Sequence, residues 1–166
     1  MIREATERDA DAVVALWTEA YFREGEGGRD APYERHEFEA TAAAAAHTLV
    51  AERDGEVVGV VALFAPGEPS RAVAVGEEGE LARLVVGSGA RRQGVGRALA
   101  ERCAELARAE GWAAIALWSR PYQTAGHRLY ESLGYERVPE RDSVDETGFG
   151  RLVFRLSLRP PRPQQR

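Results

Sequence analysis

The sequence has few of the features that mark secreted, membrane-spanning or nucleic-acid-binding proteins. Cys103 is the single cysteine among 166 residues, which excludes an internal disulfide and favours a reducing compartment. No stretch approaches the roughly 20 consecutive apolar residues of a membrane helix, and the N-terminal residues have no apolar signal core. The net charge of −5 argues against a phosphate-neutralising surface. We therefore expect a cytoplasmic protein with neither a membrane nor a nucleic acid as partner.

The composition is that of one globular domain. A hydrophobic share of 44% and a charged share of 30% are ordinary values for such domains, and the length suits a single core. The chain shows no internal repeat and no inter-domain linker. We expect one domain over residues 1–158, followed by a disordered Pro/Arg-rich tail at 159–166 with too few apolar residues to fold.

Apolar spacing and turn residues predict a succession of strands and helices. Helices are expected from residue 10 to the glycines at 25–28, and over 34–47, 94–110 and 124–133. Strands are expected over 2–5, 48–53, 56–65, 80–86, 112–118, 135–138 and 152–158, with 72–75 left open between strand and loop. The continuous apolar run at 112–118 is typical of a strand buried on both faces. This order predicts a mixed α/β domain around a central sheet.

Residues 91–98 have the chemistry of a phosphate site. They follow a predicted strand and begin a predicted helix, whose first N–H groups and dipole attract an anion. Gly94 and Gly96 remove side chains that would keep a ligand away from those groups. Arg91, Arg92 and Arg97 add positive charge. The segment therefore predicts a pyrophosphate site.

Two other phosphate loops fit this segment less well. Residues 89–94 have the glycine spacing of a P-loop, but Val95 and Gly96 replace the lysine and hydroxyl residue that contact phosphate and magnesium. A dinucleotide fingerprint begins at Gly94, but Leu99 stands in place of its third glycine. An ordinary glycine-containing helix start explains the segment equally well when it is taken alone.

A second motif lies one strand further on, where residues 129–135 read Leu-Tyr-Glu-Ser-Leu-Gly-Tyr. With both motifs, the chain resembles the GNAT acetyltransferase superfamily. Its members carry Arg/Gln-x-x-Gly-x-Gly/Ala between the fourth strand and third helix, and often Leu-Tyr-x-x-Leu-Gly-Phe/Tyr at the fourth helix. The resemblance covers residues 1–158. It implies the GNAT acyl-CoA N-acyltransferase fold, a mixed, mostly antiparallel sheet of six to seven strands with about four helices and a splay between the fourth and fifth strands.

The resemblance also implies an activity. The protein would be an acetyl-CoA-dependent N-acetyltransferase that moves acetyl directly to a primary amine of a small molecule, peptide or protein. Acetyl-CoA is then the co-substrate, no metal is expected, a small molecule is the favoured acceptor, and a homodimer is left open. The alternative is a non-catalytic acyl-CoA-binding module that senses or regulates.

The resemblance further assigns individual residues. Tyr130 matches the usual general acid, and such an acid contributes about 10²- to 10⁴-fold. Glu80 is the candidate base, with Glu78 as a weaker substitute; a core aromatic and a strand-end glutamate are the structural alternatives. Gln123 stands where the family commonly has an asparagine. The expected cofactor-binding residues are Leu84, Val85, Val86, Arg91, Arg92, Gln93, Gly94, Val95, Gly96, Arg97, Ala98 and Gln123.

The family's acceptor docks against the first two helices. Here that region contains Trp17, Tyr21, Phe22 and an acidic run at 24–30, and aromatic faces with carboxylates suit a cation. The same residues could equally close the core. Trp118 ends the central strand near the same place, and core packing is the favoured interpretation for it. His36 and His47 have no partners at metal-ligand spacing, so surface or helix-end positions are expected.

Coenzyme A should bind and raise the melting temperature, because a ligand that binds only the native state stabilises it by mass action. Thermal unfolding is measured with CoA, acetyl-CoA, ATP and NAD at equal concentrations. A shift with the two CoA species alone is the expected result. No shift and no calorimetric heat up to millimolar CoA would remove the functional content of the resemblance.

Overall fold

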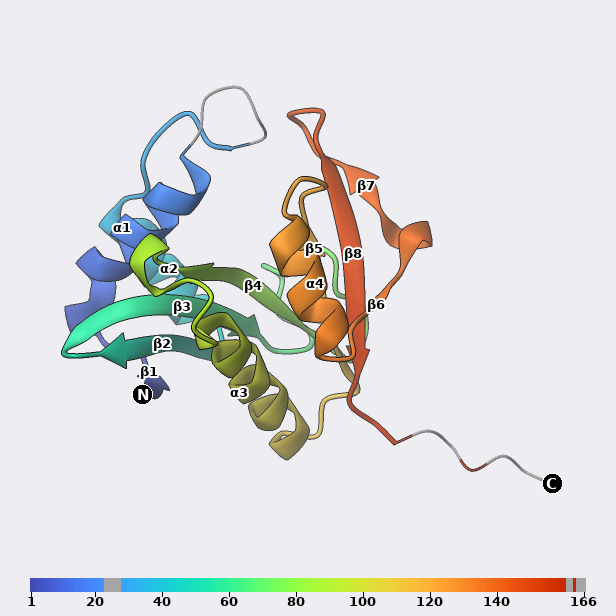
Figure 1. Ribbon diagram of the computed structural model, residues 1–166. Helices are drawn as coiled ribbons and strands as arrows, with labels where there is room; N and C mark the ends of the chain where they lie inside the picture. The colour runs from blue at the N-terminus through green and yellow to red at the C-terminus, as the bar shows by residue number, and fades with distance from the viewer. Residues whose placement is uncertain (23–27, 161–162, 164–166) are drawn as a thin grey trace.

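The computed structural model describes residues 1–22, 28–160 and 163. Within these residues eight strands form one sheet in the order β1-β2-β3-β4-β5-β8-β6, with β7 paired to β8 (Figure 1). Neighbouring strands are antiparallel except for β4 and β5. The strands are β1 (Ile2–Glu4), β2 (His47–Arg53), β3 (Glu56–Phe64), β4 (Glu78–Val86), β5 (Ala114–Ser119), β6 (Glu136–Arg137), β7 (Ser143–Val144) and β8 (Gly150–Ser157).

Helices cover both faces of the sheet. They are α1 (Ala10–Tyr21), α2 (Arg35–Ala44), α3 (Val95–Ala109) and α4 (Thr124–Ser132). Because side chains alternate along a strand, Val60 of β3 packs in the cluster that contains α1, while its neighbour Val61 packs in the cluster that contains α3. Two cores result, one on each face. No helix in the described part of the chain combines the length and apolar character needed to cross a membrane.

The sheet opens between β4 and β5. Their parallel ladder joins only three residue pairs, from Glu78 with Ala114 to Glu80 with Ala116. Beyond that point β5 continues beside β8 alone, and β4 continues beside β3 alone. In Figure 1 the two strands separate toward the top of the view. The splay expected from the family resemblance is therefore present.

An ion cluster lies at the closed end of this opening. The buried carboxylate of Glu78 accepts hydrogen bonds from Arg155 of β8 at 2.7 Å, from Arg141 at 2.8 Å and from the Val75 N–H at 3.1 Å. Burial opposes ionisation, but the two guanidinium bonds outweigh it and lower the pKa of Glu78. This carboxylate joins β4 to β8 across β5, and it is not free to act as the substitute base.

Several boundaries differ from the predicted ones. The second helix ends at Ala44 rather than at 47, so His47 begins β2. The strand count is eight because the two-residue strand β7 adds to the seven expected strands, while β6 covers only two residues of the strand expected over 135–138. Residues 72–75 form no strand, because their N–H groups bind the carboxylates of Glu80 and Glu78. Residues 23–27, with most of the acidic run, and most of the expected tail lie outside the described residues.

His47 joins three elements of the α3 side. Its Nδ1 lies 2.6 Å from Glu4 Oε1 of β1, and its Nε2 lies 2.6 Å from Glu110 Oε1 at the end of α3. Burial disfavours the charged imidazole, but the hydrogen bonds to Glu110 and Glu4 outweigh burial and raise the pKa of His47. The charged ring therefore holds the first strand and the helix end together.

The contribution of His47 to stability should depend on pH. Because its folded pKa is raised, the stabilisation is complete below the ordinary histidine pKa of about 6.5 and is lost as pH rises through the folded pKa. His47→Gln should lower the free energy of unfolding by about 1 kcal/mol at pH 6 and by less at pH 9, as measured by urea unfolding. His36→Gln, at an exposed position, is the control. Equal losses at the two pH values would contradict the assignment.

Candidate active site

A cavity of about 490 Å³ lies at the opening of the sheet. It extends from the end of α1 and from α2, across β4, to the end of β5 and the start of α4, so it includes both separated strands. Of the predicted residues, the cavity brings together Glu80, Tyr21, Trp118 and Gln123. Its lining consists of Tyr21, Gly28, Arg29, Tyr33, Ala40, Thr41, Ala44, Phe64, Ser70, Ala72, Glu80, Leu81, Ala82, Arg83, Trp118, Arg120, Tyr122 and Gln123.

Glu80 is almost fully buried in the wall of this cavity, with 2% of its surface exposed. Its carboxylate accepts three backbone N–H bonds, from Ala72 at 2.8 Å, Val73 at 2.7 Å and Ala74 at 2.9 Å. These bonds fold the β3–β4 connection over the cavity. An ionised carboxylate has about four lone-pair sites, so one acceptor site is left. Glu80 thus anchors a wall of the cavity, and its role as a base stays a prediction.

Tyr130 lies on α4 and packs into the core on the side of α3. Its ring contacts Tyr135 and Phe154 at centroid distances of 5.7 and 5.8 Å. Burial raises the pKa of Tyr130 to about 12, so the phenol is protonated at neutral pH. Burial also raises the pKa of Tyr21, and the phenol of Tyr130 adds to that effect. Tyr21 lines the cavity, whereas Tyr130 does not.

The β5-facing edge of β4 has no strand partner beyond Glu80. On the other edge, Val85 and Val86 pair with Val60 and Gly59 of β3. The Val86 carbonyl accepts a 3.3 Å bond from Arg91 Nε. Along residues 81–86, which include the predicted positions Leu84, Val85 and Val86, those backbone groups that point toward the opening have no partner strand among the described residues.

The predicted phosphate loop turns sharply before α3. Arg92 and Gly94 both have positive φ, at 63° and 79°. The Ala98 N–H donates to the Gly94 carbonyl, so the preceding N–H groups lie in the first helical turn, where an α-helix leaves donors unpaired. No acidic residue lies in this turn to offset the positive end of the dipole. The turn is suited to an anion.

Gly96 keeps a gap open beside this turn. A Cβ built there would lie 3.4 Å from Leu129 Cδ2 of α4 and 3.5 Å from Val86 Cγ2 of β4. The helix N-terminus therefore adjoins Val86 of β4 and Leu129 in the second half of α4, and only a hydrogen occupies the position between them. These features fit a phosphate-bearing ligand that continues along β4.

Several polar side chains around the loop already form hydrogen bonds within the protein. Arg97 bonds to Ser132 Oγ at 2.6 Å and lies 3.3 Å from Glu101. Gln93 bonds to Arg53 and to the Gly89 carbonyl. The side-chain oxygen of Gln123 accepts bonds from Ser119 Oγ and the Arg120 N–H, so it fixes the β5–α4 turn and leaves its amide N–H groups to meet a ligand.

Sequence analysis missed the arginines of the cavity. Among the described lining residues, Arg29, Arg83 and Arg120 are cationic and Glu80 is the one carboxylate. The expected cation site of aromatic and acidic residues is therefore not what the described residues form. The sequence did contain one sign of a positively charged cavity, because Arg83 interrupts the otherwise apolar end of a predicted strand.

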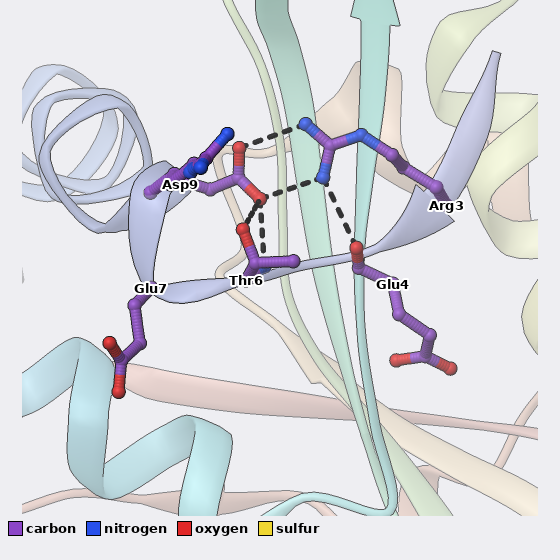
Figure 2. A pocket seen from close by; sticks show the side chains of 6 residues that line it. Arg3, Glu4, Thr6, Glu7 and Asp9 are labelled. Atoms are coloured by element: carbon purple, nitrogen blue, oxygen red, sulfur yellow. Dashed lines mark hydrogen bonds and ion pairs between the residues drawn. The ribbon is translucent and has the colours of Figure 1, made fainter.

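A second hollow, of about 560 Å³, lies at residues 3–9, away from the opening. In Figure 2, Arg3 in the lining of this hollow forms a two-bond ion pair with Asp9, at 2.8 and 2.9 Å, and the Thr6 N–H also donates to Asp9. The polar groups there satisfy one another, which is the pattern of a structural turn. No group of three or more His, Cys, Asp or Glu side chains in the described part of the chain is placed to hold a metal ion.

Comparisons with known proteins agree on one family. The family model described as "Acetyltransferase (GNAT) family" matches residues 10–135. N-acetylaspartate synthetase from Danio rerio is 34% identical over 102 residues, which cover 61% of this chain and 34% of that protein. The chain thus spans about a third of the length of that curated relative.

Solved structures share the fold over nearly the whole chain. Ribosomal-protein-alanine N-acetyltransferase from Brucella melitensis has a TM-score of 0.77 and 25% identity, covering 95% of this chain and 99% of that one. Aminoglycoside 6'-N-acetyltransferase complexed with coenzyme A has a TM-score of 0.74 and 17% identity, covering 99% of both chains.

Gly96→Val should raise the dissociation constant of CoA at least about tenfold, because a branched side chain would fill the gap beside the helix N-terminus. The Cβ contacts of 3.4 and 3.5 Å leave the fold largely intact. Gly89→Ala is the matched control, since a Cβ at Gly89 meets nothing within 4 Å. Calorimetric titration with CoA measures both variants. Unchanged affinity in the Gly96 variant would place the phosphates elsewhere.

Proposed function

The chain belongs to the GNAT family of acetyltransferases, and we propose that it transfers an acetyl group from acetyl-CoA directly to a primary amine. The proposal rests on the position of β4 between two features. One end of this strand lies beside the N-terminus of α3, which is suited to bind an anion. Glu80, nearer the other end of the strand, lines the cavity. A ligand with phosphates at one end and a reactive group at the other fits this path.

The proposal gives the cofactor residues distinct tasks. Arg91 to Ala98, with the N–H groups of the first turn of α3, would hold the pyrophosphate. Backbone groups of residues 84–86 would hold the arm by hydrogen bonds, and the amide of Gln123 would meet it from the other strand. Acetyl-CoA supplies the activated thioester when it is bound.

Proton transfer is assigned to two residues. Tyr130 would hold a proton at its hydroxyl for the departing sulfur, which its burial supports by keeping the phenol neutral. Glu80 would receive the proton of the amine through its remaining acceptor site, by way of water. Transfer is direct because the one thiol, Cys103, is buried on α3, and burial raises its pKa to about 12.

The acceptor is proposed to be a small amine. The curated relatives are named for the synthesis of N-acetylaspartate, so aspartate is the first acceptor to test, together with other amino acids, polyamines, aminoglycosides and peptide N-termini. The single cysteine supports a reducing compartment such as the cytoplasm as the place of the reaction.

Release of CoA thiol with this acceptor panel tests the function. The chain has no lysine, so side-chain auto-acetylation cannot contribute a background signal. Amine-dependent thiol release is the expected result. Tight CoA binding without turnover on any acceptor would instead support the sensor alternative.

Tyr130→Phe should lower kcat by about 100-fold or more with little change in CoA affinity, since only the hydroxyl is removed. Tyr135→Phe is the matched control. Its hydroxyl is buried without a hydrogen-bond partner among the described residues, so its loss should leave turnover unchanged. Steady-state kinetics on a confirmed acceptor separates the two variants. Full turnover by the Tyr130 variant would mean that the acid is assigned wrongly.

A further inference from the structure

Arg83 has a strained backbone at the centre of the acceptor cavity. Its φ is 54°, a left-handed value that is costly for a residue with a side chain. It lies at a bulge, because Val60 pairs with Val85 while Ala62 pairs with Ala82. The bulge directs a guanidinium into the lining of the cavity from a strand that is otherwise apolar at this end.

The guanidinium of Arg83 is held in place by aromatic rings, but most of its N–H donors have no acceptor among the described residues. It lies 4.7 Å from the ring centroid of Trp17 and 5.2 Å from that of Tyr33. Among the described residues, its one side-chain hydrogen bond goes to Thr41 Oγ1 at 3.3 Å. A guanidinium has five N–H donors in a planar fork, and no carboxylate among the described residues forms an ion pair with Arg83. Aromatic contact thus fixes the group while its donors are left for a ligand.

The other two cavity arginines are already committed. Arg29 pairs with Glu37 at 2.6 Å and stacks on Tyr33 at 3.9 Å. Arg120 pairs with Asp145 at 2.5 Å and stacks on Trp118 at 4.8 Å. A carboxylate outside the described lining therefore largely compensates the charge of each, which leaves Arg83 as the cavity arginine without such a partner among the described residues.

The one carboxylate of the described lining does not neutralise this charge. Glu80 is occupied by backbone N–H groups of residues 72–74 rather than by an arginine. The acidic residues Glu24 and Glu26 lie outside the described residues. The described cavity therefore contains an oriented guanidinium whose N–H donors have few acceptors. A carboxylate is the group that matches it, because its two oxygens can accept two parallel N–H bonds from a guanidinium.

We infer that the acceptor is a small amine that carries a carboxylate, and that Arg83 binds this carboxylate and sets the specificity of the enzyme. The inference rests on the proposed acetyl transfer and identifies the chemical class of its acceptor. It also accounts for the strain at position 83, since the left-handed backbone places the guanidinium where the ligand binds.

The test compares aspartate with its dimethyl ester, which keeps the amine and neutralises both carboxylates. Wild-type kcat/KM should favour the free acid. Arg83→Gln should lower kcat/KM for aspartate about 10- to 100-fold, as expected for loss of a charged hydrogen-bonded contact, with the value for the ester and the KM for acetyl-CoA unchanged. Arg102→Gln, which removes an arginine paired with Glu105 on the outer face of α3, controls for net charge.

A second variant guards against misfolding. Arg83→Gly removes the guanidinium and also accepts the positive φ without strain, so it should fold at least as well as wild type and show the same loss of selectivity. Thermal unfolding of both variants monitors the fold. Selectivity for aspartate that survives in a folded Arg83→Gly protein would overturn the inference.

Binding separates this inference from the proposed function. Aspartate is titrated into CoA-saturated protein by calorimetry, with wild type and Arg83→Gln compared. If turnover is absent but wild type binds aspartate and the variant does not, the proposed transfer fails and the inference on Arg83 stands. If wild type prefers the ester in kinetics, or binds aspartate no better than Arg83→Gln does, the inference is wrong.

Discussion

The short parallel contact between β4 and β5 is the constraint on which the rest of the structure depends. Three residue pairs hold the strands together, and the buried Glu78 ties the same end to Arg141 and Arg155. Loss of one arginine would leave the buried Glu78 carboxylate with less compensation, although water partly screens Arg155, whose side chain is 37% exposed. Because that end is tied, the strands can diverge at the other end without the sheet dividing.

The divergence creates both parts of the candidate site. It leaves one edge of β4 without a strand partner, and this edge leads from the cavity at Glu80 to the gap that Gly96 keeps open beside α3. Unpaired backbone groups are costly when they are buried, so a splayed sheet is retained only where solvent or a ligand satisfies them. The fold thus provides a binding path by omitting hydrogen bonds that an ordinary sheet would make.

The sequence predicted the local parts of this arrangement and missed its long-range contacts. The glycines and arginines at 91–98 could be interpreted from neighbouring residues, because helix starts and dipoles are local properties. The turn that joins β2 to β3 is local in the same sense, because its residues Asp54 and Gly55 both have the positive φ that such a turn requires. Glu80, the predicted base, lines the cavity, but its three backbone partners come from a loop whose path no periodicity indicates.

By itself the sequence determined the order of the elements and the family resemblance, and it predicted an anion-binding turn, since each element and each motif is recognised from residues that are neighbours in the chain. The tertiary structure alone decided the charge of the cavity at the opening of the sheet. Arg83 lies more than 40 residues from Thr41 and more than 60 from Trp17 along the chain, yet it contacts both. Residue spacing cannot show which arginines form ion pairs within the protein and which are left to bind a ligand, because that depends on what the fold packs against each guanidinium.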